Sequence, residues 1–225
     1  MTQEVINYGW YMKTGEKNLN IGRYADAVIA FTFAASDARN SSESACAYQM
    51  QGVALRLNTD YPEAHIAFGI AMMYAIGDHP LRFRIERDEA LVYMEEGNLQ
   101  TAWDLLWDSY KGLRKLHDYI EAAASLGFLG RVAFVKGDRR RAYLLLAEAD
   151  AMLRSVGVSG TYELNNLVWL FKRVSPLERI ALLPRTLRLI KQTGQQRRLI
   201  EVVLLTVGGN RLYNYAKRRL HEAGI

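Results

Sequence analysis

The fold is decided by residues 48–71, which read YQMQGVALRLNTDYPEAHIAFGIA. Two largely apolar stretches flank a polar turn at residues 58–60. In the second stretch Ala64, Phe68 and Ala71 follow one another at steps of four and three residues, which places them on one face of a helix. The segment therefore predicts a helical hairpin in which small residues let the two helices approach closely.

The same pattern occurs four times along the chain. The alanine that opens the second helix recurs at intervals of 37, 38 and 40 residues, at Ala27, Ala64, Ala102 and Ala142. A bulky residue follows each alanine four positions later, namely Phe31, Phe68, Leu106 and Leu146. The preceding helix carries a small residue, namely Gly15, Gly52, Ala90 and Gly130. Because such a hairpin buries its apolar faces only by stacking on its neighbours, the pattern predicts an array of hairpins.

These positions resemble the tetratricopeptide repeat. The second copy matches the family pattern at Tyr48, Gly52, Leu55, Tyr61, Ala64, Phe68 and Ala71. The resemblance covers about residues 8–156 and implies an all-α fold, a right-handed α-α superhelix of stacked hairpins. We expect a repeat array over residues 1–156, with repeats at about 8–44, 45–82, 83–122 and 123–156.

Residues 157–225 lack the repeat signature and are strongly basic. Residues 171–225 contain twelve Lys and Arg but three Glu. We expect helices at about 161–174, 195–206 and 211–222, and Pro176 and Pro184 are typical of helix starts. This C-terminal extension either caps the array or binds a partner through a basic patch of Arg197, Arg198, Arg211, Lys217, Arg218 and Arg219.

The sequence indicates a cytoplasmic protein without catalytic machinery. We find no secretory signal and no membrane-spanning stretch, and the single cysteine, Cys46, suits a reducing compartment. The four histidines lack metal-ligand spacing, and no nucleophile elbow, phosphate loop or dinucleotide fingerprint is present. We therefore expect no enzyme activity, no cofactor and no metal.

The family resemblance implies a binding surface along the first helices of successive hairpins, which line a concave face. The residues that helical periodicity places on this face are Met12, Glu16, Asn20, Gln49, Arg56, Arg84, Arg87, Met94 and Arg131. Four arginines converging there would favour an acidic peptide or a C-terminal carboxylate. The alternative is that these arginines pair with nearby Glu86, Glu89 and Glu95 and serve only solubility.

Three functions are compatible with this sequence. The first is a protein- or peptide-binding adaptor that uses the concave face. The second is a regulatory sensor whose basic C-terminal helices contact nucleic acid or an acidic partner. The third is a self-assembling scaffold, with a homodimer as its simplest form.

Overall fold

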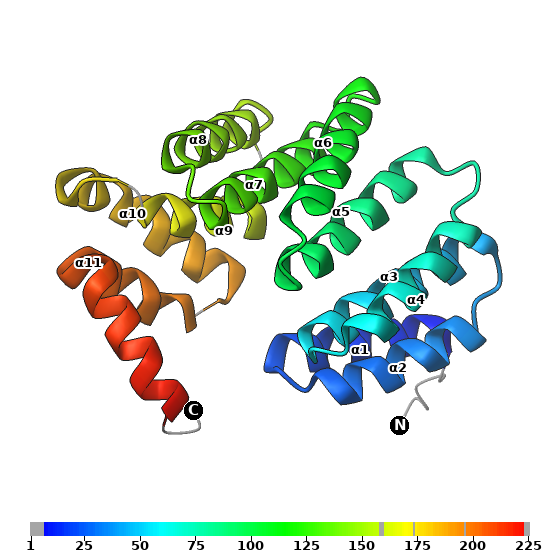
Figure 1. The fold of residues 1–225 in the computed structure, drawn as a ribbon. Helices are drawn as coiled ribbons and strands as arrows, with labels where there is room; N and C mark the ends of the chain where they lie inside the picture. Colours follow the sequence, from blue (N-terminus) through cyan, green and yellow to red (C-terminus); the bar gives the residue numbers. More distant parts are fainter. Residues whose placement is uncertain (1–6, 158–159, 173, 196, 223–225) are drawn as a thin grey trace. The chain divides into compact units, whose positions relative to one another are not determined.

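The computed structural model describes residues 7–157, 160–172, 174–195 and 197–222, and only the backbone for residues 197, 208, 210–213, 216, 217 and 219–222. These residues contain eleven helices and no strand (Figure 1). The chain divides into two compact units, residues 1–118 and 119–225. The first unit holds α1 (Tyr8–Ile21), α2 (Tyr24–Ser36), α3 (Ser41–Leu57), α4 (Tyr61–Tyr74), α5 (His79–Glu95) and α6 (Leu99–Lys115). The second holds α7 (Tyr119–Val135), α8 (Arg139–Ser155), α9 (Thr161–Phe171), α10 (Pro176–Thr193) and α11 (Arg197–Glu222).

The first eight helices form four hairpins, which we number 1 to 4 from α1–α2 to α7–α8. In each hairpin the two helices pack side by side. Three of the turns between paired helices use a glycine with positive φ, which are Gly22, Gly97 and Gly137. In hairpin 2 this position is taken by Thr59, at a φ of 69°. In each hairpin a residue with positive φ ends the first helix and reverses the chain, and glycine adopts this conformation without steric cost.

Within the hairpins, small residues meet large ones as the repeat pattern predicted. A Cβ atom added to Gly15 would lie 2.5 Å from Phe31 Cε1, and one added to Gly52 would lie 2.9 Å from Phe68 Cε1. In hairpin 4 a Cβ atom added to Gly130 would lie 2.7 Å from Leu146 Cγ. No side chain fits in these positions without displacing its neighbour, so the glycines set the distance between the paired helices.

Hairpin 3 is packed by a different pair. Ala90 and Leu106 are buried at the expected positions. A further tight contact joins Gly112 of α6 to the ring of Phe83 on α5, where no Cβ atom would fit. The large residue here comes from the first helix and the small one from the second, which reverses the arrangement of the other hairpins.

The second unit has its own core beyond hairpin 4. Leu164, Leu167, Val168 and Phe171 form one buried face of α9, as predicted. They pack in a cluster with Leu189 and Ile190 of α10 and Val202 and Leu205 of α11. The helices expected at 195–206 and 211–222 are the two arms of α11, which is interrupted at Gly209 by a φ of 61°.

One helix boundary was predicted wrongly. Pro176 occupies the first turn of α10, where Ser175 and Glu178 form a capping box. Pro184, expected to start another helix, lies inside α10. It is exposed to solvent, so water can hydrate the carbonyl that loses its helical partner, while buried Leu189 and Ile190 hold the later turns in the core.

Candidate functional site

The first helices of hairpins 2 and 3 pack against each other and share a polar face, which we call the α3–α5 face. Gln49 on α3 donates from Nε2 to Asp88 Oδ2 at 2.7 Å. Two turns further along, Arg56 Nη1 lies 2.5 Å from Glu95 Oε1. Both bonds join residues 39 positions apart, which is about one repeat. The α3–α5 face is thus organised by contacts between equivalent turns of neighbouring hairpins.

Arg87 is part of the same network and is largely withdrawn from solvent. Its side chain is buried, and Nε donates to Asp88 Oδ1 at 3.0 Å. Asp88 therefore accepts from both Arg87 and Gln49. The charge of Arg87 is already compensated by Asp88, and Arg87 orients that carboxylate. Arg87 could bind a ligand only if this ion pair broke.

Arg84 differs from the other arginines of this face. It lies four residues before Asp88, and this spacing places both on one side of α5. Its Nε is buried without a hydrogen-bond partner, as is Nε of Arg56. Unlike Arg56 and Arg87, however, Arg84 has no carboxylate within ion-pair distance among the described residues. Burial raises the pKa of the nearby Cys46 thiol, and the positive charge of Arg84 acts against that rise. Arg84 therefore contributes a positive charge that this part of the chain leaves uncompensated.

The remaining residues predicted for the face in the first unit differ in accessibility. Glu16 and Asn20 are exposed on α1, and Met94 is partly buried on α5. Met12 packs against the cluster of Ala27, Phe31 and Ala54, so its role is at least partly structural.

Arg131 belongs to the second unit, and its expected convergence with the arginines of the first unit stays a prediction. Its Cζ lies 5.0 Å from the centre of the Phe128 ring and 5.1 Å from that of Trp169. Lys172 Nζ lies 4.4 Å from the Trp169 ring. This part of the second unit combines aromatic rings with cations at cation–π distances.

The predicted basic patch is described only in part. Arg198 donates from Nη1 to Glu201 Oε2 at 2.8 Å and from Nη2 to Asn165 Oδ1 at 3.1 Å, so it helps to hold α11 against α9. Arg218 is exposed. The side chains of Arg197, Arg211, Lys217 and Arg219 lie outside the described residues. The patch as a partner site stays a prediction.

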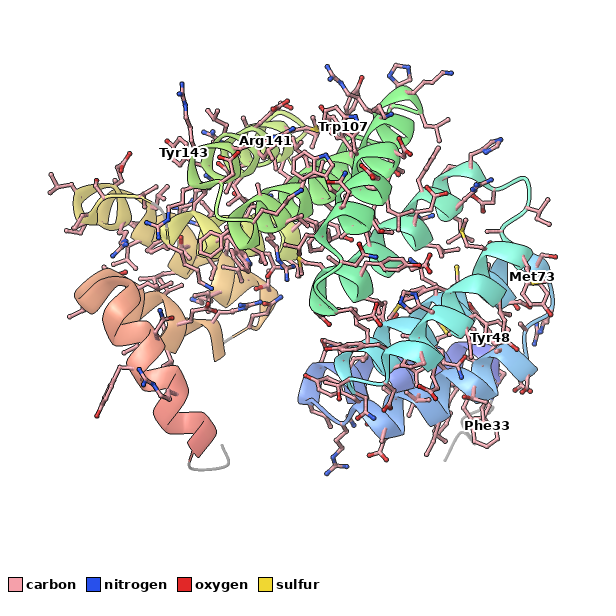
Figure 2. All side chains as sticks on the ribbon, in the orientation of Figure 1. Phe33, Tyr48, Met73, Trp107, Arg141 and Tyr143 are labelled. Atoms are coloured by element: carbon pink, nitrogen blue, oxygen red, sulfur yellow. The ribbon has the colours of Figure 1, made fainter. Side chains whose placement is uncertain are left out.

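The first unit also has cavities away from the α3–α5 face. One of about 300 Å³ lies between α1 and α2 and is lined by residues including Trp10, Tyr11, Ile29 and Phe33. The Tyr11 and Phe33 rings stack at 5.2 Å, and Phe33 is half exposed (Figure 2). Another of about 340 Å³ lies between α5 and α6. None of the residues predicted to bind peptide lines either cavity.

Sequence reasoning missed the environment of His65, on α4. Its Nδ1 lies 3.1 Å from Glu89 Oε1 and its Nε2 lies 3.1 Å from Glu96 Oε2, both from hairpin 3. The seven-residue spacing of Glu89 and Glu96 puts them on one face of α5 and was the available signal, but no partner could be chosen without knowing how hairpins 2 and 3 are aligned. Within the described residues, no group of three or more His, Cys, Asp and Glu side chains is arranged to hold a metal ion.

Arg185 in the second unit was also missed. It binds Asp150 of α8 through two nitrogens, at 2.8 and 3.0 Å, and Glu163 of α9 through Nε at 2.7 Å. Both carboxylates are about 5% exposed. This triad joins three helices and is positioned to stabilise the unit.

No helix in the described part of the chain is both long and apolar enough to cross a membrane. No protein-family model and no curated protein matches the sequence.

Solved structures with the same fold do match. A Rap protein complexed with competence and sporulation factor superposes with a TM-score of 0.78 at 13% identity, over 99% of this chain and 66% of that protein. The Rap conjugation gene regulator of plasmid pLS20, in complex with a Phr peptide, gives 0.67 at 18% identity, over 98% of this chain and 65% of that protein. This chain thus spans about two thirds of the length of these two proteins.

A third match has a different origin. The tetratricopeptide-like repeats of a putative kinesin light chain from Podospora anserina give a TM-score of 0.55 at 18% identity, over 89% of this chain and 95% of that one. Proteins of different function therefore share this arrangement of helical hairpins. The chain has the all-helical fold of the tetratricopeptide-like repeat proteins.

Proposed function

We propose that this chain is a non-catalytic peptide- or protein-binding protein that uses the face made by the first helices of its hairpins. The proposal is supported by the fold, which is similar to two Rap proteins solved with a bound factor or peptide. The observation that carries it is the uncompensated charge of Arg84 on an otherwise paired polar face. A ligand carboxylate would supply the acceptor that Arg84 lacks.

The neighbours of Arg84 favour a defined binding geometry. Arg56 and Gln49 are held by Glu95 and Asp88, so this part of the face is ordered before a ligand arrives. A buried nitrogen without an acceptor costs about 1–3 kcal/mol, which a ligand acceptor would offset. Guanidinium groups bind carboxylates through two parallel hydrogen bonds, so we propose an acidic side chain or a C-terminal carboxylate as the ligand group.

Other residues would extend the contact along the peptide. Glu16 and Asn20 are accessible on α1 and offer hydrogen-bonding groups to a peptide backbone or side chain. Met94 offers an adaptable apolar contact. Arg131 in the second unit is proposed as a further cationic contact, with its guanidinium kept close to aromatic rings.

The proposal is tested with fluorescent peptides that differ in two respects, acidic or neutral sequence and free or amidated C-terminus. We expect the acidic peptides to bind and Arg84→Ala to weaken their binding by about 10- to 150-fold, because loss of one charge-assisted bidentate contact costs about 1.5–3 kcal/mol. The matched control is Arg82→Ala on the same helix, since Arg82 is exposed and pairs with Glu86 within α5. That variant should bind within about twofold of wild type.

Two outcomes would count against the proposal in different ways. Equal affinity of wild type and Arg84→Ala would remove Arg84 as the anchor and with it the acidic preference. If none of the four peptides binds, the chain as tested is not a receptor for short peptides.

A second candidate function is a peptide-responsive regulator. It is favoured by the similarity to a Rap protein that regulates conjugation genes. In this case ligand binding on the first helices would change contacts made elsewhere on the chain, and the basic C-terminal residues are the proposed output surface. Binding to duplex DNA that falls steeply with salt would support a nucleic-acid output, whereas no binding at low salt would leave an acidic protein as the partner to test.

A further inference from the structure

Besides Glu86, helix α5 and its C-terminal cap carry four carboxylates in two pairs with the same spacing. Asp88 and Glu95 are seven residues apart and contact α3. Glu89 and Glu96 are also seven residues apart and contact His65 on α4. Seven residues make almost two full turns of a helix, so each pair occupies one face. Hairpin 2 therefore holds α5 from two sides, through Gln49 and Arg56 on one and His65 on the other.

The imidazole of His65 bridges two turns of α5. Its two ring nitrogens each lie 3.1 Å from a carboxylate oxygen, Nδ1 from Glu89 and Nε2 from Glu96. The ring also packs on Tyr93, with 4.5 Å between ring centres. Tyr93 lies between the two glutamates in sequence, at spacings of four and three residues, and so shares their face.

This geometry is compatible with one protonation state of the imidazole. A carboxylate can only accept hydrogen bonds, so each of the two contacts needs an N–H on His65. The imidazolium has two such groups, whereas neutral imidazole has one and directs a lone pair at the other carboxylate. Loss of the proton therefore breaks at least one of the two contacts between α4 and α5.

The groups around His65 agree with this reading. Burial alone would lower the pKa of His65, but hydrogen bonds to Glu96 and Glu89 outweigh it and raise the pKa above 6.5. Tyr93 is the other titratable group that faces the ring from α5, and burial followed by the charges of Glu89 and Glu96 raises its pKa. The charged residues of α3 are Glu43, in its first turn, and Arg56, which pairs with Glu95; neither is among the groups that shift the pKa of His65.

On α4 itself, Tyr61 lies one turn before His65, and the carboxylate Glu63 lies two residues before it and is exposed. The contacts of the imidazole are with the groups on hairpin 3 and not with Tyr61 or Glu63. The protonation of the His65 ring is therefore set by the carboxylates of hairpin 3.

We infer that His65 is a proton-operated clamp between hairpins 2 and 3, closed when the imidazole is charged and partly released when it is neutral. The stabilisation from the clamp is complete below pH 6.5 and is lost as the pH rises through the higher pKa of the folded chain. The apolar cluster shared by the two hairpins, which includes Phe68, Leu81 and Ile85, remains in place in both states. The clamp thus changes the polar contacts between the two hairpins without unfolding them. Any effect of the clamp on ligand binding at Arg84 rests on the proposed function.

The first test is an NMR titration of the histidine rings in the full chain. We expect His65 to titrate above pH 6.5, and its pKa to fall in Glu89→Gln/Glu96→Gln. His79, which is exposed, serves as the reference within the same chain. A His65 that titrates at or below pH 6.5, or whose pKa is unchanged by the double substitution, would overturn the inference.

The second test measures opening of the joint by hydrogen exchange between pH 6 and 8, corrected for the intrinsic rate, in wild type, His65→Gln and His79→Gln. In wild type and His79→Gln we expect exchange in the α4–α5 region to become about two- to tenfold faster across this range, because one or two individually weak charged contacts are lost. In His65→Gln this step should vanish, and the α1–α2 region should show none in any variant. The same step in His65→Gln would contradict the clamp. No peptide ligand is needed, so this result is independent of the proposed function.

Discussion

Ion pairs join helices in two regions of this molecule, but with different exposure to water. Between hairpins 2 and 3, Arg56 and His65 pair with carboxylates of α5 that are 20–34% exposed. In the second unit, Arg185 pairs with Asp150 and Glu163, whose side chains are 7% and 6% exposed. The interacting groups are similar in kind. Water can reach the carboxylates between hairpins 2 and 3 and hydrate them if a partner is lost, but it barely reaches the carboxylates of the second unit.

This difference separates an adjustable contact from a fixed one. When a pair with a partly exposed carboxylate opens, water hydrates that carboxylate and little free energy is lost. When a buried pair loses one partner, the remaining charge stays in a poorly solvated site. We therefore expect the joint between hairpins 2 and 3 to respond to pH and ligands, and the Arg185 triad to hold its three helices rigidly.

The largest effect is expected at the triad. Arg185→Leu should lower the free energy of unfolding of the second unit by about 3–5 kcal/mol, because it leaves two buried carboxylates with one exposed neighbour, Arg154, 3.3 Å from Asp150. Hydrogen exchange of α8, α9 and α10 would measure this loss. Arg185→Lys is the matched control, since it keeps the charge but not the forked geometry, and it should lose less. If Arg185→Leu were as stable as wild type, the proposed difference in rigidity between the two regions would be refuted.

A smaller effect is expected from pH, with opposite sign in the two units. Glu201 of α11 is largely buried, which would raise its pKa, but Arg198 and Lys172 outweigh this and lower the pKa below 4.5. Its stabilisation of the second unit is therefore present above pH 4.5 and is lost as the pH falls through the lower pKa of the folded state. His65 acts in the other direction, because its contribution to the first unit is lost as the pH rises.

The measurement is a pair of stability profiles from pH 3 to 8, resolved by unit through hydrogen exchange. Glu201→Gln should remove about 1 kcal/mol of acid sensitivity from the second unit and leave the first unit unchanged. His65→Gln should alter the first unit alone: it removes a stabilisation that wild type has in full below pH 6.5, and with it the loss of stability as the pH rises above 6.5. If Glu201→Gln leaves the acid sensitivity of the second unit intact, other carboxylates are responsible for it.

How far the sequence predicts this molecule depends on whether an interaction repeats. The contacts of Gly15 with Phe31 and of Gly52 with Phe68 recur at one period, so the pattern reveals both partners. The Arg56–Glu95 pair follows the same period and was among the pairings anticipated from composition. Gly112 against Phe83 was not expected, because it is an additional contact at positions outside the repeat pattern.

The Arg185 triad shows where prediction from one sequence ends. Its members are 22 and 35 residues apart and occur once, in a region without the repeat signature. No internal copy indicates how α8, α9 and α10 are aligned, and many carboxylates in the sequence are equally plausible partners. The binding face is an intermediate case. Periodicity placed Arg84, Arg87 and Arg56 along it, but only side-chain contacts distinguish the uncompensated Arg84 from the paired Arg87 and Arg56.

The smallest effect is expected at the Arg56–Glu95 pair, whose side chains are 12% and 28% exposed. Arg56→Leu should cost about 0.5 kcal/mol in the first unit, because Glu95 can turn to water and the leucine retains part of the apolar contact of the arginine stem. A double-mutant cycle with Glu95→Gln isolates the pair and should give a coupling energy below about 1 kcal/mol, measured by denaturant unfolding. A coupling as large as the loss in Arg185→Leu would mean that exposure does not set the strength of these pairs. The joint between hairpins 2 and 3 would then be as rigid as the second unit, and a clamp controlled by one proton could not adjust it.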